Sequence, residues 1–299
     1  MSNVIKLLSG LVLVISIYLA YQKLYILDRV EIDNIKGKRV LITGASAGIG
    51  EQLAYHYAKY GAKIVLTART EKVLQKVVKK CKEIGNGLET DYHYIAADMS
   101  ENESPSRVIT TAVEKLNGLD VLVLNHIWPQ EIRAWKNSQD DLAMIDKLMR
   151  VNFLSHVHLA THAMPYLEKH DGQVIVVSSW AAYLSDPYLA AYSSTKSALT
   201  SYFTSLQKEL QLKQSPVTIT ICHLGFISTA NAINFVKHSP YSIFISRGEG
   251  PSDTALSIVK AGSTRQPHLV YPYLLGLYIT NFPQFHWNVL MKYIIGAAD

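Results

Sequence analysis

The stretch "LITGASAGIG", Leu41–Gly50, decides the fold. It begins as an apolar, β-branched run that predicts a buried strand, and it passes through a glycine-rich turn. An amphipathic pattern over 49–60 follows and predicts a helix. In a strand, glycine turn and helix in direct succession, the helix N-terminus can bind the phosphates of a dinucleotide. The sequence therefore predicts an α/β domain that starts with a nucleotide-binding turn.

Three glycines in this turn have separate expected roles. Gly44 permits the tight turn, Gly48 lets the backbone approach a pyrophosphate, and Gly50 lets the helix pack close to the strand. The neighbouring residues that we also assign to cofactor binding are Ser46, Ala47 and Ile49. A glycine pattern alone is a weak indication, and a purely structural turn is the alternative. Its place directly after the first strand favours the dinucleotide site.

Short apolar runs alternate with amphipathic stretches along most of the chain. Strands are predicted at 39–43, 63–67, 92–97, 120–125, 173–179, 217–224 and 267–272. Helices are predicted at 49–60, 71–84, 104–116, 139–167 and 190–212. The strand segments are nearly continuously apolar, as strands covered on both faces are. This alternation predicts a doubly wound, parallel Rossmann sheet of about seven strands.

Composition limits the classes of partner. The 299 residues carry a net charge of +5 with no long basic block, so we do not expect nucleic acid as a partner. The net positive charge is compatible with binding to an anionic lipid surface or to a phosphate group. Cys81 and Cys222 are too few for a zinc site or a disulfide framework, so we expect two buried free thiols and no metal.

The N-terminus contains an uncharged run, Leu7–Gln22, bounded by Lys6 and Lys23. The run is slightly short for a membrane-spanning helix, but lysines at both ends can snorkel to the interface. A cleaved signal peptide is the alternative, and bulky Tyr18 and Leu19 stand where a cleavage site needs small residues. We therefore expect an uncleaved, single-pass membrane anchor helix.

The predicted organisation has four parts. They are a membrane anchor at 1–27, a linker at 28–37, a catalytic domain at 38–272 and a hydrophobic, aromatic C-terminal extension at 273–299. The extension is either a helix packed on the core or a surface that meets a membrane or a second subunit, since aromatic residues are enriched at such interfaces.

The end of the second strand bears on the choice of cofactor. In "LTARTEK", Thr67 and Ala68 are neutral and Arg69 is basic, followed by Thr70. An acidic residue here would bind the ribose 2′-hydroxyl of NAD, whereas an arginine can pair with the 2′-phosphate of NADP. The sequence favours NADP(H) with Arg69 and Thr70 as ligands. The alternative is that Arg69 is a solvated residue before the next helix.

Two further strand ends supply candidate cofactor contacts. Asp98 follows the third strand, where it can accept from the adenine amino group or stabilise its own turn, and Met99 comes next. Asn125 ends the fourth strand, where its side chain can brace the sheet beside the cofactor ribose. His126 and Ile127 follow it and are assigned to the same site.

Tyr192 and Lys196 lie four residues apart in a predicted helix, so both can face one cleft. An unperturbed tyrosine has a pKa of about 10, and a nearby ammonium should lower that pKa enough for acid–base work. Ser179 ends the fifth strand and can polarise a substrate carbonyl, whereas Ser178 should point to the opposite face. Asn152 is a poor helix former inside a predicted helix, which indicates a local distortion or a bound water.

These residues together resemble the short-chain dehydrogenase/reductase family. The pattern TGxxxGxG is matched at 43–50, followed by Asn152, Ser179 and the Tyr192–Lys196 pair. The resemblance covers roughly 38–271 and implies the strand order 3-2-1-4-5-6-7. It implies that the tyrosine exchanges a proton with the substrate oxygen and that the lysine binds the nicotinamide ribose. The serine would hold the carbonyl, and Asn152 would complete a water-linked proton relay.

Within that family the chain is most similar to the 11-beta-hydroxysteroid dehydrogenase type 1-like group, through "LDVLVLNHI", "VNFLSHV" and "SDPYLAAYSSTKSAL". This resemblance implies that Gly225, Ile227 and Thr229 flank the nicotinamide and that 230–244 forms part of a mobile substrate lid. It also implies homodimers through the helices at 139–167 and 190–212.

The same resemblance implies the endoplasmic reticulum membrane, with the catalytic domain in the lumen. The basic residues after the anchor alone would favour a cytosolic domain, and we adopt the lumenal expectation. Two departures concern the site: Ala47 stands where NADP-binding relatives often have a basic residue, and Trp180 and Ala182 follow the serine where relatives have a smaller or more flexible pair.

The sequence thus predicts a membrane-anchored, NADP(H)-dependent oxidoreductase that interconverts a secondary alcohol and a ketone on a lipid-soluble, steroid-like substrate. Membrane lipid and a second copy of the chain are the expected partners. The same chemistry on a retinoid or another lipid carbonyl is one alternative. A non-catalytic nucleotide-binding membrane protein is another, against which the complete set of four reactive residues argues.

Overall fold

The computed structural model describes residues 30–85, 91–130, 132–273 and 276. A seven-stranded sheet forms the centre, in the order β3-β2-β1-β4-β5-β6-β7, and every neighbouring pair runs parallel. The strands are β1 (Arg39–Thr43), β2 (Lys63–Ala68), β3 (Tyr92–Ala96), β4 (Val121–Leu124), β5 (Gln173–Ser179), β6 (Thr218–Leu224) and β7 (His268–Tyr271). The predicted sheet and its strand order are confirmed.

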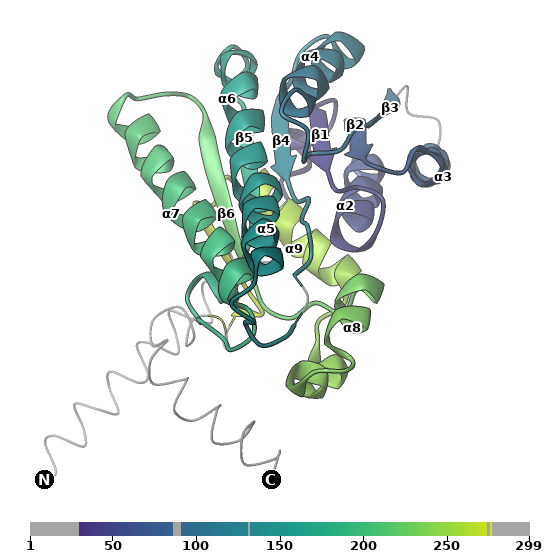
Figure 1. The fold of residues 1–299 in the computed structure, drawn as a ribbon. Helices are drawn as coiled ribbons and strands as arrows, with labels where there is room; N and C mark the ends of the chain where they lie inside the picture. The colour runs from purple at the N-terminus through teal and green to yellow at the C-terminus, as the bar shows by residue number, and fades with distance from the viewer. Residues whose placement is uncertain (1–29, 86–90, 131, 274–275, 277–299) are drawn as a thin grey trace, which may run out of the picture.

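Helices cover both faces of this sheet (Figure 1). They are α2 (Gly48–Lys59), α3 (Glu71–Ile84), α4 (Ser104–Leu116), α5 (Gln139–Met149), α6 (Ser155–Glu168), α7 (Ala190–Leu212), α8 (Ala230–Val236) and α9 (Pro251–Ser263). Parallel strands need such crossover elements, because each strand must restart at the same edge as the one before.

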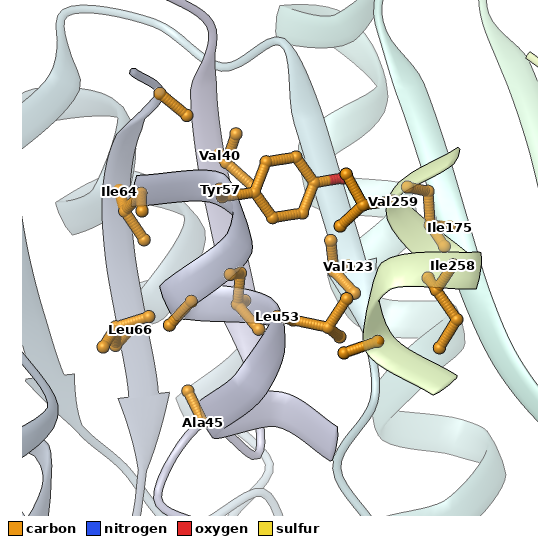
Figure 2. Packing of buried hydrophobic residues seen from close by; sticks show 14 of the residues in the cluster. Val40, Ala45, Leu53, Tyr57, Ile64, Leu66, Val123, Ile175, Ile258 and Val259 are labelled. Carbon is orange, nitrogen blue, oxygen red and sulfur yellow. The ribbon is translucent and has the colours of Figure 1, made fainter. Parts of the chain in front are cut away.

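Alternate residues of each strand enter two separate cores. In β1, Val40 and Ile42 pack with α2, α3 and α9, whereas Leu41 packs with α4, α6 and α7. Figure 2 shows the first core, in which Leu53 and Tyr57 of α2 lie among strand side chains and residues of α9. Burial on both faces explains why the strand segments read as continuous apolar runs rather than as alternating patterns.

Two features of the helices differ from the sequence-based expectation. The single helix expected at 139–167 is divided into α5 and α6 by a π-helical turn, Arg150–Leu154. This turn contains Asn152, where the sequence indicated a distortion. Helix α9 was not expected, although it supplies the crossover between β6 and β7 and packs against α2. Within the segment expected as a lid, α8 is followed by a 3-10 helix, Pro240–Arg247.

The terminal segments are described only in part. The expected anchor at 1–27 and most of the extension at 273–299 lie outside the described residues. Within those that are described, no helix has both the length and the apolar character needed to cross a bilayer. In the segment expected as a linker, Ile35 is buried in the first core, and the Asn34 side chain donates to the Ser263 carbonyl at 2.8 Å.

Both cysteines are buried free thiols, as expected. Cys81 faces the first core from α3 and Cys222 faces it from β6. Burial raises the pKa of each thiol, to about 12 for Cys81, so both stay protonated near neutral pH.

An ion pair fastens the amino-terminal ends of β1 and β4. The Arg39 guanidinium donates to both carboxylate oxygens of Asp120 at 2.7 and 2.8 Å, and the Arg39 backbone N–H donates to one of them at 2.8 Å. Burial opposes ionisation of Asp120, but these hydrogen bonds hold its pKa below the usual range. Because the folded-state pKa is depressed, this stabilisation is present above the unfolded pKa and is lost as pH falls through the folded value.

We expect Asp120→Ala to lower the free energy of unfolding by about 2 kcal/mol at pH 7, since Arg39 would keep a half-buried charge without its partner. Asp91→Ala is the matched control, because the Lys63–Asp91 pair is exposed and 3.3 Å long. It should cost less than about 0.5 kcal/mol. Urea unfolding followed by circular dichroism measures both. Equal losses, or an Asp120 effect that does not shrink below about pH 4, would contradict this assignment.

Candidate active site

The predicted site residues meet at the carboxyl edge of the sheet, because every strand is parallel. The glycine turn follows β1, Arg69 and Thr70 follow β2, and Asp98 and Met99 lie just beyond β3. The remaining strand-end residues are Asn125, His126 and Ile127 after β4, Ser179 at the end of β5, and Gly225, Ile227 and Thr229 after β6. Asn152, Tyr192 and Lys196 come from the π-turn and from α7.

The ends of β1 and β4 are held together through Thr43. Its hydroxyl oxygen accepts from the backbone N–H groups of Asn125, at 2.8 Å, and His126, at 3.2 Å. The Asn125 amide donates back to the carbonyls of Thr43 and Gly44. A Cβ at Gly44 would lie 2.7 Å from the His126 Cα, so this approach requires glycine. Asn125 thus braces the sheet, as its sequence position indicated.

The first turn of α2 fits a pyrophosphate. The helix begins at Gly48, and its N-cap residue, Ala47, makes no side-chain hydrogen bond to it, so backbone N–H groups face the edge of the sheet without a side-chain cap. Gly48 has φ +61°, and a Cβ there would lie 2.9 Å from the Thr229 methyl group. Thr229, which follows β6, therefore packs against the glycine turn that follows β1.

Basic side chains gather at the β2 and β3 ends. The Arg69 guanidinium lies 4.8 Å from the centroid of the Trp128 ring, and the Lys147 ammonium lies 3.5 Å from it. Burial disfavours the Asp98 carboxylate, but hydrogen bonds from Ser100 and the charges of Arg69 and Lys147 lower its pKa below the ordinary value. Asp98 accepts from the Ser100 backbone N–H at 2.9 Å, which is the turn-stabilising role considered for it.

The candidate proton-transfer residues lie together where β5 meets α7. Ser179 is near enough to the Tyr192 phenol to favour its ionised form and so to lower its pKa. Lys196 is 2% exposed, and its ammonium lies 6.0 Å from the centroid of the Tyr192 ring and donates to the Val177 carbonyl at 2.9 Å. Ser178 points to the other side of the strand and pairs with Thr200 at 2.7 Å, as strand alternation predicted.

The pKa of Tyr192 differs from the sequence-based expectation. Burial raises it above the ordinary value, Ser179 opposes that rise, and the expected lowering by Lys196 is not found. Burial also lowers the pKa of Lys196 to about 8. Both shifts have one cause, since desolvation disfavours phenolate and ammonium alike. Burial therefore favours the protonated form of Tyr192.

Asn152 is fully buried and holds the backbone of Trp128 from both sides. Its side-chain oxygen accepts from the Trp128 N–H at 2.6 Å, and its amide donates to the Trp128 carbonyl at 3.0 Å. The π-turn rotates Asn152 out of the regular helix pattern, which lets its side chain reach the chain that follows β4.

Three residues of the site were missed from the sequence. Gln130 accepts from the Tyr192 backbone N–H and donates to the Tyr188 carbonyl, so it positions the start of α7. Trp128 and Lys147 form the aromatic and basic cluster with Arg69. Gln130 and Trp128 follow Asn125–Ile127 in a loop without any periodic pattern, so no signal in the sequence marked them.

Trp180 shapes the end of the site nearest β6. A Cβ at Gly225 would lie 2.8 Å from the Trp180 ring, so the indole fills the space that glycine leaves. The Gly225 N–H donates to the Tyr271 carbonyl at 2.8 Å. Ile227 is buried and pairs with Glu249 in an isolated β-bridge, and Thr229 caps α8 by accepting from the Ala232 N–H.

The fold and these residues define the class of protein. The family model described as short chain dehydrogenase matches residues 38–239, and the chain belongs to the short-chain dehydrogenase/reductase family. It is therefore an oxidoreductase of alcohol and ketone groups that uses NAD or NADP. A Gallus gallus relative named hydroxysteroid 11-beta-dehydrogenase 1-like protein is 46% identical over 248 residues, which are 83% of each chain.

Two solved structures share the fold. A short chain dehydrogenase from Burkholderia cenocepacia J2315 in complex with NADP has a TM-score of 0.66 and 25% identity, over 79% of this chain and 96% of that one. A short chain dehydrogenase/reductase from Burkholderia phymatum in complex with NAD has a TM-score of 0.72 and 20% identity, over 86% and 96%. One of these structures holds NADP and the other NAD, so the likeness in fold does not distinguish the two cofactors for this chain.

Gly48→Ala should weaken dinucleotide binding at least about ten-fold, because the new methyl group meets Thr229 at the phosphate-binding turn. Gly37→Ala is the matched control: Gly37 has a similar φ of +73°, but a Cβ there has no neighbour within 4 Å. Both variants should lose about 1 kcal/mol of stability from backbone strain. Isothermal titration with the dinucleotide separates them, and equal affinities would show that Gly48 does not line the phosphate site.

Proposed function

We propose that this chain is a membrane-anchored, NADP(H)-dependent oxidoreductase that interconverts a secondary alcohol and a ketone on a hydroxysteroid. The observation that carries the proposal is the placement of Tyr192 with a buried Lys196, whose ammonium lies 6.0 Å from the centroid of the Tyr192 ring, near the strand end that carries Ser179 and a glycine turn fitted to a dinucleotide.

The residues divide the chemistry among them. NADP(H), when bound, supplies or accepts the hydride. Ser179 hydrogen-bonds the substrate oxygen and orients it toward Tyr192, which donates the proton in ketone reduction and receives it in alcohol oxidation. Lys196, whose ammonium donates to the Val177 carbonyl, would bind the nicotinamide ribose of the bound cofactor and so place it beside the Tyr192 phenol. Asn152 holds the Trp128 backbone and takes part in the proton relay.

The preference for NADP(H) rests on Arg69. It is exposed at the end of β2, where Ala68 and Thr70 are its neutral neighbours and a 2′-phosphate would be placed. Lys147 adds a second positive charge beside the Trp128 ring, and Asp98 is turned into its own loop by Ser100. This basic balance favours a phosphate over a free 2′-hydroxyl.

The steroid substrate is supported by the names of the relatives and by an apolar N-terminus suited to a membrane that holds such substrates. The uncharged run Leu7–Gln22 would anchor the chain in the endoplasmic reticulum membrane, with the catalytic domain in the lumen. This location would give the site access to a lipid-soluble ketone or alcohol.

A homodimer through α5, α6 and α7 is part of the same proposal. Large apolar side chains are exposed on and between these helices, at Leu142, Leu154, Tyr202 and Leu212. Leu212 is 85% exposed, which is unusual for leucine at the end of a helix that otherwise packs on the core. A second copy would bury this surface.

Tyr192→Phe should reduce kcat about 100-fold or more, because the proton donor is removed while the ring and its packing remain. The affinity for NADPH should stay within about two-fold, a change of less than about 0.5 kcal/mol. Tyr202→Phe removes the hydroxyl of an exposed tyrosine on the same helix and serves as the control. Turnover of a panel of steroid, retinoid and simple carbonyl substrates measures the effect. Near-normal activity of Tyr192→Phe would refute the mechanism.

Arg69→Ala should weaken NADPH binding about ten-fold, the equivalent of one charge-assisted hydrogen bond, and leave NADH affinity nearly unchanged. Arg107→Ala, which removes an exposed arginine from α4, should change neither. Fluorescence titration with each dinucleotide gives the four affinities. An equal loss for NADPH and NADH would rule out a 2′-phosphate role for Arg69.

A further inference from the structure

The side chain of His126 has no role in the site so far, although it is buried at the junction of three elements. Its Nδ1 lies 2.9 Å from the Thr43 hydroxyl at the end of β1, and its Nε2 lies 2.7 Å from the Ser155 hydroxyl at the start of α6. His156 stacks on it with ring centroids 4.0 Å apart and planes 7° apart, which fixes the plane of the imidazole.

The Ser155 hydroxyl replaces a backbone hydrogen bond that the π-turn disrupts. In an α-helix the Ser155 backbone N–H would donate to the Val151 carbonyl, four residues back. In this turn it donates to the Arg150 carbonyl, five residues back. The Val151 carbonyl thereby loses its helical donor, and the Ser155 hydroxyl donates to it at 2.7 Å.

Two hydroxyl groups compete for the ring nitrogens of His126. The Thr43 hydroxyl lies 3.0 Å from the Val123 carbonyl as well as 2.9 Å from Nδ1, and the Ser155 hydroxyl faces both the Val151 carbonyl and Nε2. Burial, with Lys196 nearby, lowers the pKa of His126 to about 3, so the ring stays neutral and carries one N–H. Because the Val151 carbonyl has lost its helical donor, we assign the Ser155 hydrogen to Val151 and the ring hydrogen to Nε2. Nδ1 then accepts from Thr43, whose hydroxyl turns from Val123 to the ring, and the bonds run from Thr43 through His126 and Ser155 to the π-turn.

We propose that His126 is a positioning residue, which braces the π-turn that presents Asn152 and ties that turn to the glycine-turn end of β1. The proposal rests on the proposed function, in which Asn152 takes part in proton transfer. His126 touches no reacting atom in this scheme. It acts by holding Ser155, and through Ser155 the backbone from Arg150 to Asn152.

The hydrogen-bond chain can be tested on the full-length protein without any substrate. With ¹⁵N-labelled histidine, the His126 resonance should show the Nε2–H tautomer and no titration between about pH 5 and 9. The two groups that could disturb it, His156 and Lys196, both face it from buried positions. An Nδ1–H tautomer, or a titration within that range, would overturn the chain of bonds.

The effect on the reaction is tested by kinetics. His126→Ala should lower kcat about ten-fold or more, since small displacements in an active site are costly, with NADPH affinity within about two-fold of the original. His126→Gln should recover part of the loss, because its amide can donate to Ser155. His158→Ala, which removes an exposed histidine from α6, should have no effect. If His126→Ala does not fold, Ser155→Ala should give the same loss of kcat.

A double variant distinguishes a shared link from two separate defects. Adding Ser155→Ala to His126→Ala should cause no further loss of kcat, because both break one link. Additive losses, or an unchanged kcat in His126→Ala, would overturn the positioning role while leaving the proposed function intact. If the unaltered protein turns over no substrate of the panel, the proposed function fails instead, and the tautomer measurement still decides whether the brace exists.

Discussion

The close approach of β1 and β4 is the constraint on which the site depends. Successive strands are added outward from this pair in opposite directions, with β2 and β3 on the β1 side and β5 to β7 on the β4 side. A crevice opens where neighbouring crossovers lead away from each other. The Thr43 hydroxyl accepts from the backbone N–H groups of Asn125 and His126, and the Asn125 side-chain amide donates to the Thr43 carbonyl. The two strand ends are thereby fixed at a separation that admits only glycine at position 44.

Burial sets the electrostatics of the reactive pair. Tyr192 and Lys196 share one poorly solvated place, where the neutral form of each is favoured. Burial thus raises the pKa of Tyr192 and lowers that of Lys196. Ser179 opposes the rise for Tyr192, and the Val177 carbonyl, which accepts from Lys196, favours the charged form of the lysine. Any proton transfer proposed for this pair would therefore depend on burial and on these neighbouring polar groups.

The strands of the sheet could be predicted because apolar runs mark them locally, and the strand order followed from the family resemblance. Motif spacings also proposed Ser179, Tyr192 and Lys196 as candidate reactive residues. Contacts between distant segments leave no such trace: Asn152 and Trp128 are 24 positions apart, and Gln130 and Tyr192 are 62 apart. The direction of the Tyr192 pKa shift was wrong for the same reason, since the sequence pattern shows a neighbouring lysine but not the depth of burial. Helix α9 was missed, although a seventh parallel strand required a crossover.

Trp180 and Gly225 share one space, because a Cβ added to Gly225 would lie only 2.8 Å from the indole ring. A larger residue at 225 would require a smaller one at 180, and a smaller residue at 180 would leave a void beside the reactive serine. The two positions therefore constrain each other in size and would be expected to change together among related enzymes. A library that enlarges or reshapes the substrate pocket should vary them as a pair, because single changes at either position would register as loss of stability.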